Sequence, residues 1–339
     1  MTFPQLSGLG WTDFYAEQIT PEDAGLVPMR IASVHRSRLS AQTGQDQIRL
    51  ELPLHVTTND FAVGDWVLVD PDSRVAMRRL ERASLLRRRN ENMRSPQLIA
   101  ANVDTLFIVT SCNDDFNAAR LERYLALANE AGTTPVIVLT KIDKTDDAAG
   151  YRDQALELQR DLQVVMVNAK DPDATDALLP WSGPGQTVAL VGSSGVGKST
   201  LLNTLAEKAP DQQQLTGGIR EGDAKGRHTT TARSLHGIAG GGWVIDTPGM
   251  RTLHVSDVAA GLEVLFAEIT ELAPLCRFRN CTHEHEPGCA VQAAVKAGDL
   301  SADRLERWRK LDQENTANTP VQTGPRNNRV TLPRGGKRR

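Results

Sequence analysis

The chain has 339 residues and a formal net charge of −3, so it is long enough for two or three domains. Hydrophobic residues make up 40% of it, which excludes a disordered chain, while aromatic residues make up only 4% and argue against wide base-stacking surfaces. No apolar run approaches the length of a membrane span, and the N-terminal residues lack the pattern of a signal peptide. We therefore expect a cytoplasmic protein that does not contact a membrane.

In chain order, residues 1–25 are expected to form a flexible, slightly acidic leader. Segments of β-type composition follow at 30–37, 48–54 and 65–70, separated by Gly, Asp and Asn turns. Apolar residues alternate along the second segment, which is typical of a strand half-buried in a small barrel. An OB-type barrel is the natural candidate for residues 26–95, although strands alone do not identify one.

The basic residues are unevenly spread. Residues 77–94 contain seven arginines and two glutamates, and no acidic residue follows Glu314. Either basic segment alone is compatible with a solvated surface, but two of them in a mildly acidic chain favour contact with a polyanion, which we expect to be RNA. The low aromatic content predicts that phosphate and shape contacts outweigh base stacking.

From about residue 97, apolar strands alternate with helical segments. The strands are expected at 105–111, 134–140, 163–169, 186–192 and 241–249. This alternation predicts a doubly wound α/β sheet over residues 96–254. Residues 255–314 have a helical pattern interrupted by a Cys/His cluster, with Ser301 as the N-cap of one helix. The basic residues 315–339 lack periodicity and are expected to be a disordered tail.

A segment that begins at Gly192 matches the phosphate-binding pattern G-x-x-x-x-G-K-[ST] in full, between an apolar strand and a helix-like segment. Glycines let backbone N–H groups curve around phosphate oxygens, and the helix N-terminus adds positive charge. Lys198 is expected to bridge the β- and γ-phosphates, as a catalytic residue, and Ser199 to bind Mg²⁺. The residues expected around the phosphates are Gly192, Ser193, Ser194, Gly195, Val196, Gly197, Lys198, Ser199 and Thr200.

Two further segments complete a predicted phosphate and magnesium site. Asp246 ends an apolar strand and Gly249 follows in the turn Asp-Thr-Pro-Gly, where a carboxylate can hold the Mg²⁺ shell and a glycine N–H can sense the γ-phosphate. The polar, glycine-rich residues 217–231 are expected to be a switch that closes when a threonine binds Mg²⁺. The residues alone do not choose between Thr229 and Thr230.

The segment Thr-Lys-Ile-Asp is typical of a guanine-binding loop. The Asp143 carboxylate can accept hydrogen bonds from guanine N1–H and N2–H₂, a pair that adenine lacks, so it argues against a P-loop ATPase of another pathway. Lys141 would lie along the base, and Thr140 replaces the more frequent Asn. A second base-contacting loop, with an N–H at its middle residue, is expected at Asn168, Ala169 and Lys170.

The base loops precede the phosphate loop, which reverses the usual order along a GTPase chain. A circularly permuted chain can build the same site, because native contacts need neighbours in space and not a fixed order in sequence. The link between the old ends is expected at 171–185, and the new ends lie after Gly249 and before residue 105. The switch turn then leads directly into the C-terminal segment, so we expect nucleotide state to move that segment.

Water activation lacks its usual residue. Many GTPases place Gln directly after the switch glycine, but this chain has Met250 there, and a thioether cannot orient water. Intrinsic hydrolysis is expected to be slow unless another group or a partner substitutes. His228 is a candidate for that group.

Three of the four cysteines lie close together in the chain. Cys276, Cys281 and Cys289 are accompanied by His283 and, as a rival ligand, His285. Three thiolates and one imidazole form a closed tetrahedral set, which predicts a structural Zn²⁺ and no catalytic one. A disulfide is not expected in a cytosolic chain.

These motifs together resemble the circularly permuted GTPases of the RsgA (YjeQ/YloQ) family over nearly the whole chain. The resemblance rests on Ala-Asn-Val-Asp at 101–104, Gly-Arg-His-Thr-Thr-Thr at 226–231, the three nucleotide motifs above and the Cys/His spacing. It implies an OB domain with an arginine-rich connector at 26–95, a permuted GTPase domain at 96–254 and a helical zinc domain at 255–314.

The resemblance also implies residue roles and a function. It favours His228 as the residue that positions water, Thr230 as the Mg²⁺ ligand and His283 as the Zn²⁺ ligand. It implies hydrolysis of GTP to GDP and phosphate, stimulated by the small ribosomal subunit during late maturation, with contacts to rRNA. We expect a monomer. The alternative is a GTP-controlled RNA-binding module in which hydrolysis is incidental.

Overall fold

The computed structural model forms two compact units, residues 1–253 and 254–339, which are described separately. None of the helices in the described residues is long and apolar enough to cross a membrane. The residues that the structure describes are 3–44, 46–88, 96–171, 173–207, 233–238, 240–246, 255–319, 322–323 and 329–330.

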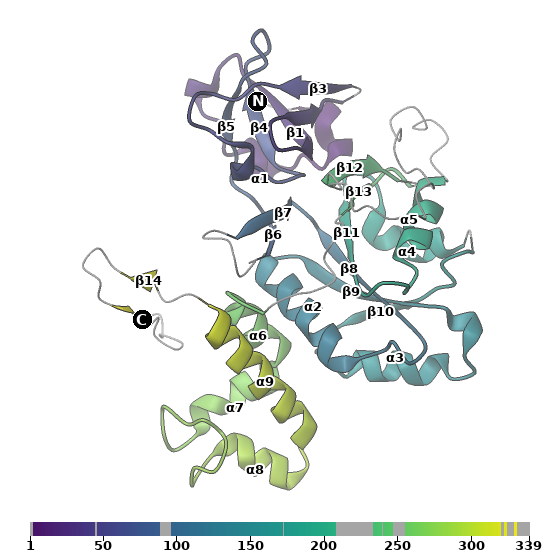
Figure 1. Cartoon of the computed structure of the whole chain (residues 1–339), viewed down its shortest axis with the longest axis vertical. Helices are drawn as coiled ribbons and strands as arrows, with labels where there is room; N and C mark the ends of the chain where they lie inside the picture. The colour runs from purple at the N-terminus through teal and green to yellow at the C-terminus, as the bar shows by residue number, and fades with distance from the viewer. Residues whose placement is uncertain are drawn as a thin grey trace. The chain divides into compact units, whose positions relative to one another are not determined.

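The first unit contains a five-stranded β-barrel (Figure 1). Its strands are β1 (Val27–Val34), β2 (Leu39–Gln42), β3 (Gln47–Leu50), β4 (Trp66–Val69) and β5 (Ala76–Arg79). Antiparallel pairing runs from β3 through β2, β1 and β4 to β5. A parallel bridge between Glu51, just after β3, and Val75, just before β5, closes the ring. This order is a Greek-key barrel of the predicted OB type.

The N-terminal residues are folded onto the barrel and differ from the flexible leader that the sequence predicted. They form η1 (Pro4–Leu9), α1 (Asp13–Ala16) and η2 (Pro21–Asp23). Leu6, Leu9 and Tyr15 are buried, and the Trp11 ring packs edge-on against Trp66 with 4.8 Å between ring centroids. A few aromatic side chains supply this packing, so the overall polar composition of the segment conceals it.

The remainder of the first unit is a doubly wound α/β sheet, as predicted (Figure 1). Five of its strands are parallel, and β12 alone runs antiparallel to its neighbour. In spatial order the strands are β10 (Gln163–Met166), β9 (Thr134–Thr140), β8 (Thr105–Ser111), β11 (Thr187–Val191), β13 (Trp243–Asp246) and β12 (Arg233–Gly237). The helices are α2 (Ala118–Ala131), α3 (Ala148–Leu156), α4 (Ala174–Ser182) and α5 (Lys198–Glu207).

The strand order is that of a circularly permuted chain. β11 lies between β8 and β13, although it follows β8, β9 and β10 along the sequence. The link expected at 171–185 is helical over most of its length, because it contains α4, which buries Leu178 and Ser182. Pro180 lies inside α4 and conceals the helix in the sequence pattern.

The barrel and the α/β region share one sheet. β12 pairs with β13 on one side and with β1 on the other, with Ser234 opposite Ser33 and Arg233 opposite Val34. The result is an 11-stranded sheet, and a separate ribbon consists of β6 (Leu85–Arg88) and β7 (Gln97–Ala101). The two predicted domains at 26–95 and 96–254 are therefore continuous through backbone hydrogen bonds.

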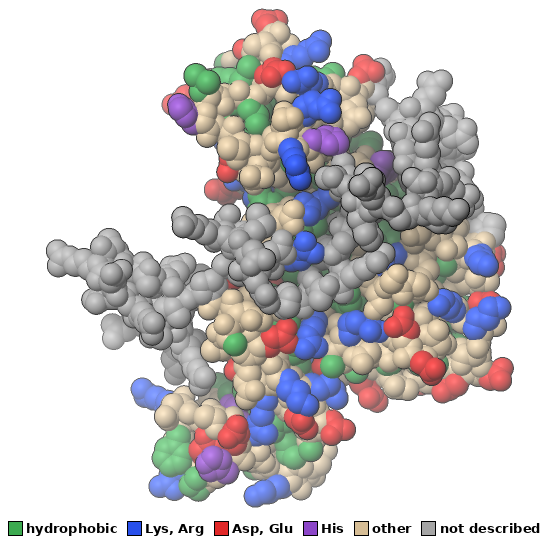
Figure 2. Space-filling model, viewed as in Figure 1, with side chains coloured by type: hydrophobic (Ala, Val, Ile, Leu, Met, Phe, Trp, Pro, Cys, Tyr) green, Lys and Arg blue, Asp and Glu red, His purple; other side chains and the backbone are tan. Residues whose placement is uncertain are grey.

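Two arginines of the basic segment 77–94 form ion pairs inside the first unit. Hydrogen bonds from Arg78 lower the pKa of Asp23 to about 2. Arg82 donates from Nε and Nη2 to the buried Asp65 carboxylate, at 2.6 and 2.7 Å. Both pairs hold barrel segments together, so phosphate contact would depend on other basic residues. Figure 2 shows several Lys and Arg side chains following one another down the barrel face in view.

Arg30 is a fully buried cation at the centre of the first unit. Its Nη1 donates to the Leu9 carbonyl at 2.5 Å and its Nη2 to the Asn102 carbonyl at 3.0 Å. Its guanidinium carbon lies 5.8 Å from the ring centroid of Trp66. One side chain thus connects the N-terminal segment, the barrel and the start of the α/β region.

We expect Arg30→Met to destabilise the first unit by about 3 kcal/mol, because two buried carbonyls lose their donor. For a unit of this size that loss should lower the melting temperature by roughly 6–12 °C in calorimetry. Arg49→Met is the matched control, since Arg49 is an exposed barrel arginine whose ion pair with Glu51 is also exposed, and it should shift melting by no more than about 1 °C. Equal shifts in the two variants would contradict this role for Arg30.

The second unit is helical around the Cys/His segment. Its helices are α6 (Ala259–Leu265), α7 (Ala267–Leu272), η5 (Ala273–Leu275), α8 (Ala290–Ala297) and α9 (Ala302–Asn318). Ser301 caps α9 as predicted, by accepting from the Arg304 N–H. The Arg304 side chain joins the helices, because it donates to Glu268 and to the Leu265 carbonyl, each at 2.7 Å, and covers the Phe266 ring.

The predicted tail at 315–339 is only partly described. Helix α9 continues to Asn318, four residues beyond the predicted end of the helical segment at 314. Two short antiparallel strands follow, β14 (Gln322–Thr323) and β15 (Arg329–Val330). The other residues after 319 lie outside the described part of the chain.

Candidate functional site

The predicted phosphate loop connects β11 to α5. Gly192, Gly195 and Gly197 have φ angles of 143°, 83° and 97°, which favour glycine. A Cβ on Gly192 would lie 2.1 Å from the Val109 carbonyl oxygen, so the loop passes directly against β8. The Val196 side chain is buried and anchors the loop in the hydrophobic core, whereas Ser194 and Ser199 are exposed.

Lys198 places its charge at the centre of this loop. Its Nζ donates to the Gly192 carbonyl at 2.8 Å and to the Ser193 carbonyl. Ser199 and Thr200 follow in the first turn of α5, whose N-terminal N–H groups and dipole favour an anion. Loop backbone, ammonium and helix terminus together form an arrangement suited to phosphate.

The Thr-Lys-Ile-Asp segment lies beside the phosphate loop. The Thr140 side chain is fully buried, and its Oγ1 donates to the Val196 carbonyl at 2.6 Å. Lys141 adopts a left-handed conformation, with φ of 56°, where the chain turns from β9 into η4 (Ile142–Lys144). The Thr140 hydroxyl therefore joins the base loop to the phosphate loop, although Thr140 and Val196 are 56 residues apart in sequence.

Asp143 presents an ionised carboxylate at the end of this turn. A hydrogen bond from Lys144 lowers the pKa of Asp143, and the charge of Lys170 acts in the same direction. The Lys144 Nζ lies 3.0 Å from the carboxylate, and the Asp143 side chain is 40% exposed. A carboxylate that stays ionised can only accept hydrogen bonds, as the guanine edge requires.

The second base loop meets the other two at Gly197. The Ala169 carbonyl accepts from Thr204 Oγ1 of α5 at 2.8 Å, and Asn168 Oδ1 accepts from the Lys170 N–H at 3.2 Å. A Cβ on Gly197 would lie 3.5 Å from Thr140 Oγ1 and 3.7 Å from Ala169 Cβ. Three segments that are distant in sequence thus meet at Gly197. Only the circular permutation inferred from the order of the motifs predicted that they would.

Several predicted residues fall outside these contacts. Asp246 closes β13, where its backbone pairs with Ser234, which puts it on the strand next to β11. The structure does not describe the remaining predicted switch and catalytic residues. These are His228, Thr229, Thr230, Gly249 and Met250.

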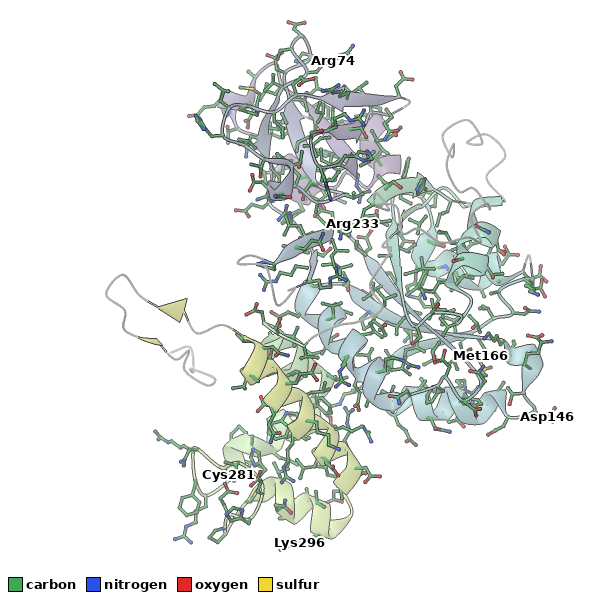
Figure 3. All side chains as sticks on the ribbon, in the orientation of Figure 1. Arg74, Asp146, Met166, Arg233, Cys281 and Lys296 are labelled. Carbon is green, nitrogen blue, oxygen red and sulfur yellow. The ribbon has the colours of Figure 1, made fainter. Side chains whose placement is uncertain are left out.

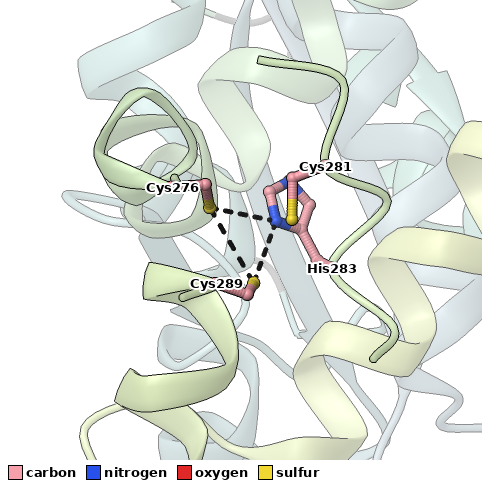
Figure 4. A group of neighbouring side chains, drawn as sticks. All are labelled: Cys276, Cys281, His283 and Cys289. Carbon is pink, nitrogen blue, oxygen red and sulfur yellow. Dashed lines mark hydrogen bonds between the residues drawn. The ribbon is translucent and has the colours of Figure 1, made fainter. Parts of the chain in front are cut away.

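The predicted zinc ligands form a cluster in the second unit (Figures 3 and 4). His283 Nδ1 lies 3.5 Å from Cys276 Sγ and 3.4 Å from Cys289 Sγ, and the two sulfurs are 3.8 Å apart. Cys281 completes the set, with all four ligand atoms within 4.8 Å of one another. A tetrahedral Zn²⁺ with Zn–S bonds of about 2.3 Å requires S–S edges of about 3.8 Å and S–N edges of about 3.6 Å. The donor set therefore fits Zn²⁺.

The surroundings favour the metal-binding protonation states of Cys276 and His283, whereas burial raises the pKa of Cys281 to about 12. Burial alone would raise the pKa of Cys276, but hydrogen bonds from the Val291 and Ala290 N–H groups lower it overall. Burial lowers the pKa of His283, which favours the neutral imidazole that a metal needs. The Cys289 sulfur also accepts from the Gln292 N–H at 3.4 Å, at the start of α8.

The structure separates the two candidate histidines. His283 is buried, and its ring packs against Trp308 with 5.5 Å between centroids. The His285 side chain is 86% exposed and lies beside Glu284. Glu286 fixes the intervening loop, because its carboxylate accepts from the N–H and the Oγ1 of Thr282.

Sequence reasoning missed the residues that hold these sites in place. The Thr204 hydroxyl donates a hydrogen bond to the Ala169 carbonyl at 2.8 Å, and the Gln292 amide donates one to the His283 carbonyl at 2.7 Å. Glu286 carried a weak signal, since it lies inside the Cys/His spacing. No such signal exists for Thr204, whose partner is distant in sequence.

A parallel sheet with a phosphate loop at its centre and guanine-type loops earlier in the chain defines the class of circularly permuted P-loop GTPases. The family model described as RsgA GTPase matches residues 79–256. The chain belongs to the RsgA GTPase family, and it is a GTP hydrolase.

Relatives match almost the whole chain. A Mesorhizobium japonicum protein named small ribosomal subunit biogenesis GTPase RsgA is 65% identical and covers 99% of this chain and 97% of its own. A Vibrio vulnificus protein named small ribosomal subunit biogenesis GTPase RsgA 2 is 49% identical and covers 95% of this chain and 91% of its own.

Two solved structures share the fold. The crystal structure of YjeQ from Thermotoga maritima has a TM-score of 0.63 and 27% identity, and the match covers 85% of this chain and 98% of that one. The crystal structure of YloQ, described as a circularly permuted GTPase, has a TM-score of 0.60 and 25% identity, with 89% and 99% covered. Both support the permuted strand order described above.

Proposed function

We propose that this GTPase binds the small ribosomal subunit in the cytoplasm, acts in its late maturation, and hydrolyses GTP in response to that contact. The 65% identical relative named for small ribosomal subunit biogenesis supports this role. The convergence of the phosphate loop and both base loops at Gly197 supports a single guanine nucleotide site. We propose that rRNA is the contacted component and that the protein acts as a monomer.

Each part of the nucleotide has a proposed partner in the chain. The loop from Gly192 to Thr200 would surround the phosphates, with Lys198 as their cationic contact. Asp143 would accept from the guanine edge, and Ala169 would offer its N–H to the base. Ser199 and Thr230 would bind Mg²⁺, which supplies charge neutralisation between the β- and γ-phosphates.

The second unit would carry one structural Zn²⁺ on Cys276, Cys281, His283 and Cys289. The spacing of these donors fits a closed tetrahedral site, which leaves no position for substrate. The ion would link the loop after η5 to the start of α8, where Cys289 is the N-cap. Its role there is to stabilise the unit that carries α9.

We expect His228→Ala to retain GTP affinity within about twofold while reducing subunit-stimulated turnover by roughly 100-fold or more, because His228 would position the attacking water. Equilibrium binding of a fluorescent GTP analogue and phosphate release measure the two quantities separately. His55→Ala is the control, since His55 is an exposed histidine in the barrel loop between β3 and β4. Unchanged stimulated turnover in His228→Ala would remove this residue from the mechanism.

The direct test of the proposed function is GTP turnover against added small subunits, large subunits and free RNA. We expect stimulation of at least about tenfold by small subunits alone. Because Met250 cannot orient the attacking water, a partner would have to order the groups that do. Binding of small subunits without stimulation would favour the alternative, a GTP-controlled RNA-binding module. Stimulation by large subunits alone would contradict the proposal.

A further inference from the structure

The loop between Cys276 and Cys281 carries an exposed aromatic side chain between two arginines. Phe278 is 40% exposed, and Leu275, immediately before the loop, is 70% exposed. Arg277 and Arg279 are exposed on either side of Phe278. In Figure 2 the second unit shows hydrophobic side chains at its surface next to basic ones.

The backbone of this loop is restrained on both sides of Phe278. Its two ends are cysteines of the metal cluster (Figure 4). The Cys281 N–H donates to the Phe278 carbonyl at 3.2 Å, and the Arg277 N–H donates to the Gly288 carbonyl at 3.0 Å. Gly288 has a φ of 76°, and a Cβ there would lie 3.0 Å from Arg277 Cβ. The exposed ring is therefore held ready for a partner.

The charge around the ring is positive. The guanidinium carbon of Arg277 lies 5.5 Å from the Phe278 ring centroid. Neither Arg277 nor Arg279 forms an ion pair among residues 255–319. The first acidic residues after the loop are Glu284 and Glu286. Glu284 lies beside His285, and the Glu286 carboxylate accepts a hydrogen bond from the Thr282 hydroxyl. An aromatic face flanked by uncompensated cations suits an anionic ligand that also has a flat ring.

We propose that this loop is a binding site for an unpaired RNA nucleotide, whose base stacks on Phe278 while Arg277 and Arg279 contact the adjoining phosphates. Stacking on an aromatic side chain with flanking cations is how proteins bind single-stranded nucleic acid without base-specific hydrogen bonds. A duplex does not fit, because its bases are not available to the ring. The site deepens the proposed role on the small subunit and rests on it.

The test uses the full-length protein and a single-stranded uridine-rich RNA oligonucleotide that contains one 2-aminopurine, whose fluorescence falls when it stacks. We expect the wild-type protein to bind this RNA and quench the probe. Phe278→Ala should weaken binding by about 5- to 100-fold and abolish the quenching, while Phe278→Trp should restore both. Val264→Ala, which removes an exposed apolar group elsewhere on the same unit, should change neither.

A second variant keeps the test decisive if Phe278→Ala fails to fold. The double substitution Arg277→Gln and Arg279→Gln should reduce the slope of log affinity against log salt concentration by about 1.4 for single-stranded RNA. Bound zinc, measured in every variant, distinguishes a lost contact from an unfolded unit.

The outcomes separate this site from the proposed function. Unchanged RNA affinity and quenching in Phe278→Ala would overturn the stacking site, even if small subunits still stimulate turnover. Weaker binding to small subunits with unchanged RNA binding would assign the loop to a protein partner and would also overturn it. A wild-type protein that small subunits do not stimulate would instead contradict the proposed function.

Discussion

Asp143→Asn should weaken GTP binding by at least about 100-fold and should make xanthosine triphosphate the better ligand. The hydrogen bond from Lys144 lowers the pKa of Asp143 and keeps the carboxylate ionised, so it would accept from both donors on the guanine edge. An amide would instead direct its NH₂ group at guanine N2–H₂, whereas xanthine has a carbonyl oxygen there that accepts. Competition of both triphosphates against a fluorescent GTP analogue measures the exchange of preference.

The control for this switch is Asp146→Asn. Asp146 lies three residues further along the same loop and is also exposed, so its substitution should leave both affinities unchanged within about twofold. GTP binding by Asp143→Asn as tight as that of the wild type would contradict the base contact. Equal loss of both triphosphates by a variant that keeps the wild-type melting temperature would also contradict it, because residue 143 would then not discriminate between the bases.

His283→Ala should unfold the second unit, while His285→Ala should leave it intact. A structural Zn²⁺ contributes about 10 kcal/mol or more to the folding of a small domain, which exceeds the stability expected from a helical core of this size. His283 is buried within the metal cluster, and His285 is almost fully exposed. The pair of variants therefore compares loss of a buried imidazole in the cluster with loss of an exposed one, and the zinc content shows which imidazole is a ligand.

Zinc content and the fluorescence of Trp308 measure this prediction. Trp308 packs against His283 and is the only tryptophan after residue 254, although the other tryptophans contribute a constant background. We expect His283→Ala to lose zinc and to become protease-sensitive after residue 254, and we expect GTP binding by the first unit to persist. Equal zinc content in both variants would contradict the assignment of His283.

The longest apolar strands were predictable from sequence, and the shorter polar ones were not. β8 and β9 begin and end at the predicted residues, because a strand buried on both faces has a continuous apolar run. β2 and β12 contain Ser, Gln, Arg and His, and they are strands because their backbones pair with neighbours. The pairing of β12 with β1 joins segments far apart in the chain, and β2 is a four-residue strand between β1 and β3, so no apolar pattern marks either one.

The N-terminal segment was mispredicted, and the helix inside the inter-strand link was not predicted, for related reasons. In the first case, Trp11 and Tyr15 find Trp66 as a packing surface, which exists only after the barrel has formed. In the second case, α4 is stabilised by burying Leu178 against the sheet. Composition and periodicity describe a segment by itself, and both segments owe their structure to tertiary contacts.

The candidate sites were predictable as motifs, but their assembly was not. Spacing marked Lys198 and Asp143 separately, since each belongs to a loop with its own local geometry. The bonds that bring the loops together, from Thr140 to Val196 and from Thr204 to Ala169, are contacts that only the fold reveals. Likewise, spacing alone left His283 and His285 as rivals, and burial separates them.

Loops from three parts of the chain are proposed to hold one guanosine triphosphate. The decisive measurement is a crystal structure with a non-hydrolysable GTP analogue and Mg²⁺. We expect one nucleotide whose guanine N1 and N2 lie about 3 Å from the Asp143 carboxylate and whose β- or γ-phosphate oxygens lie about 3 Å from Lys198 Nζ. A nucleotide that contacts Lys198 with its base turned away from Asp143 would contradict it.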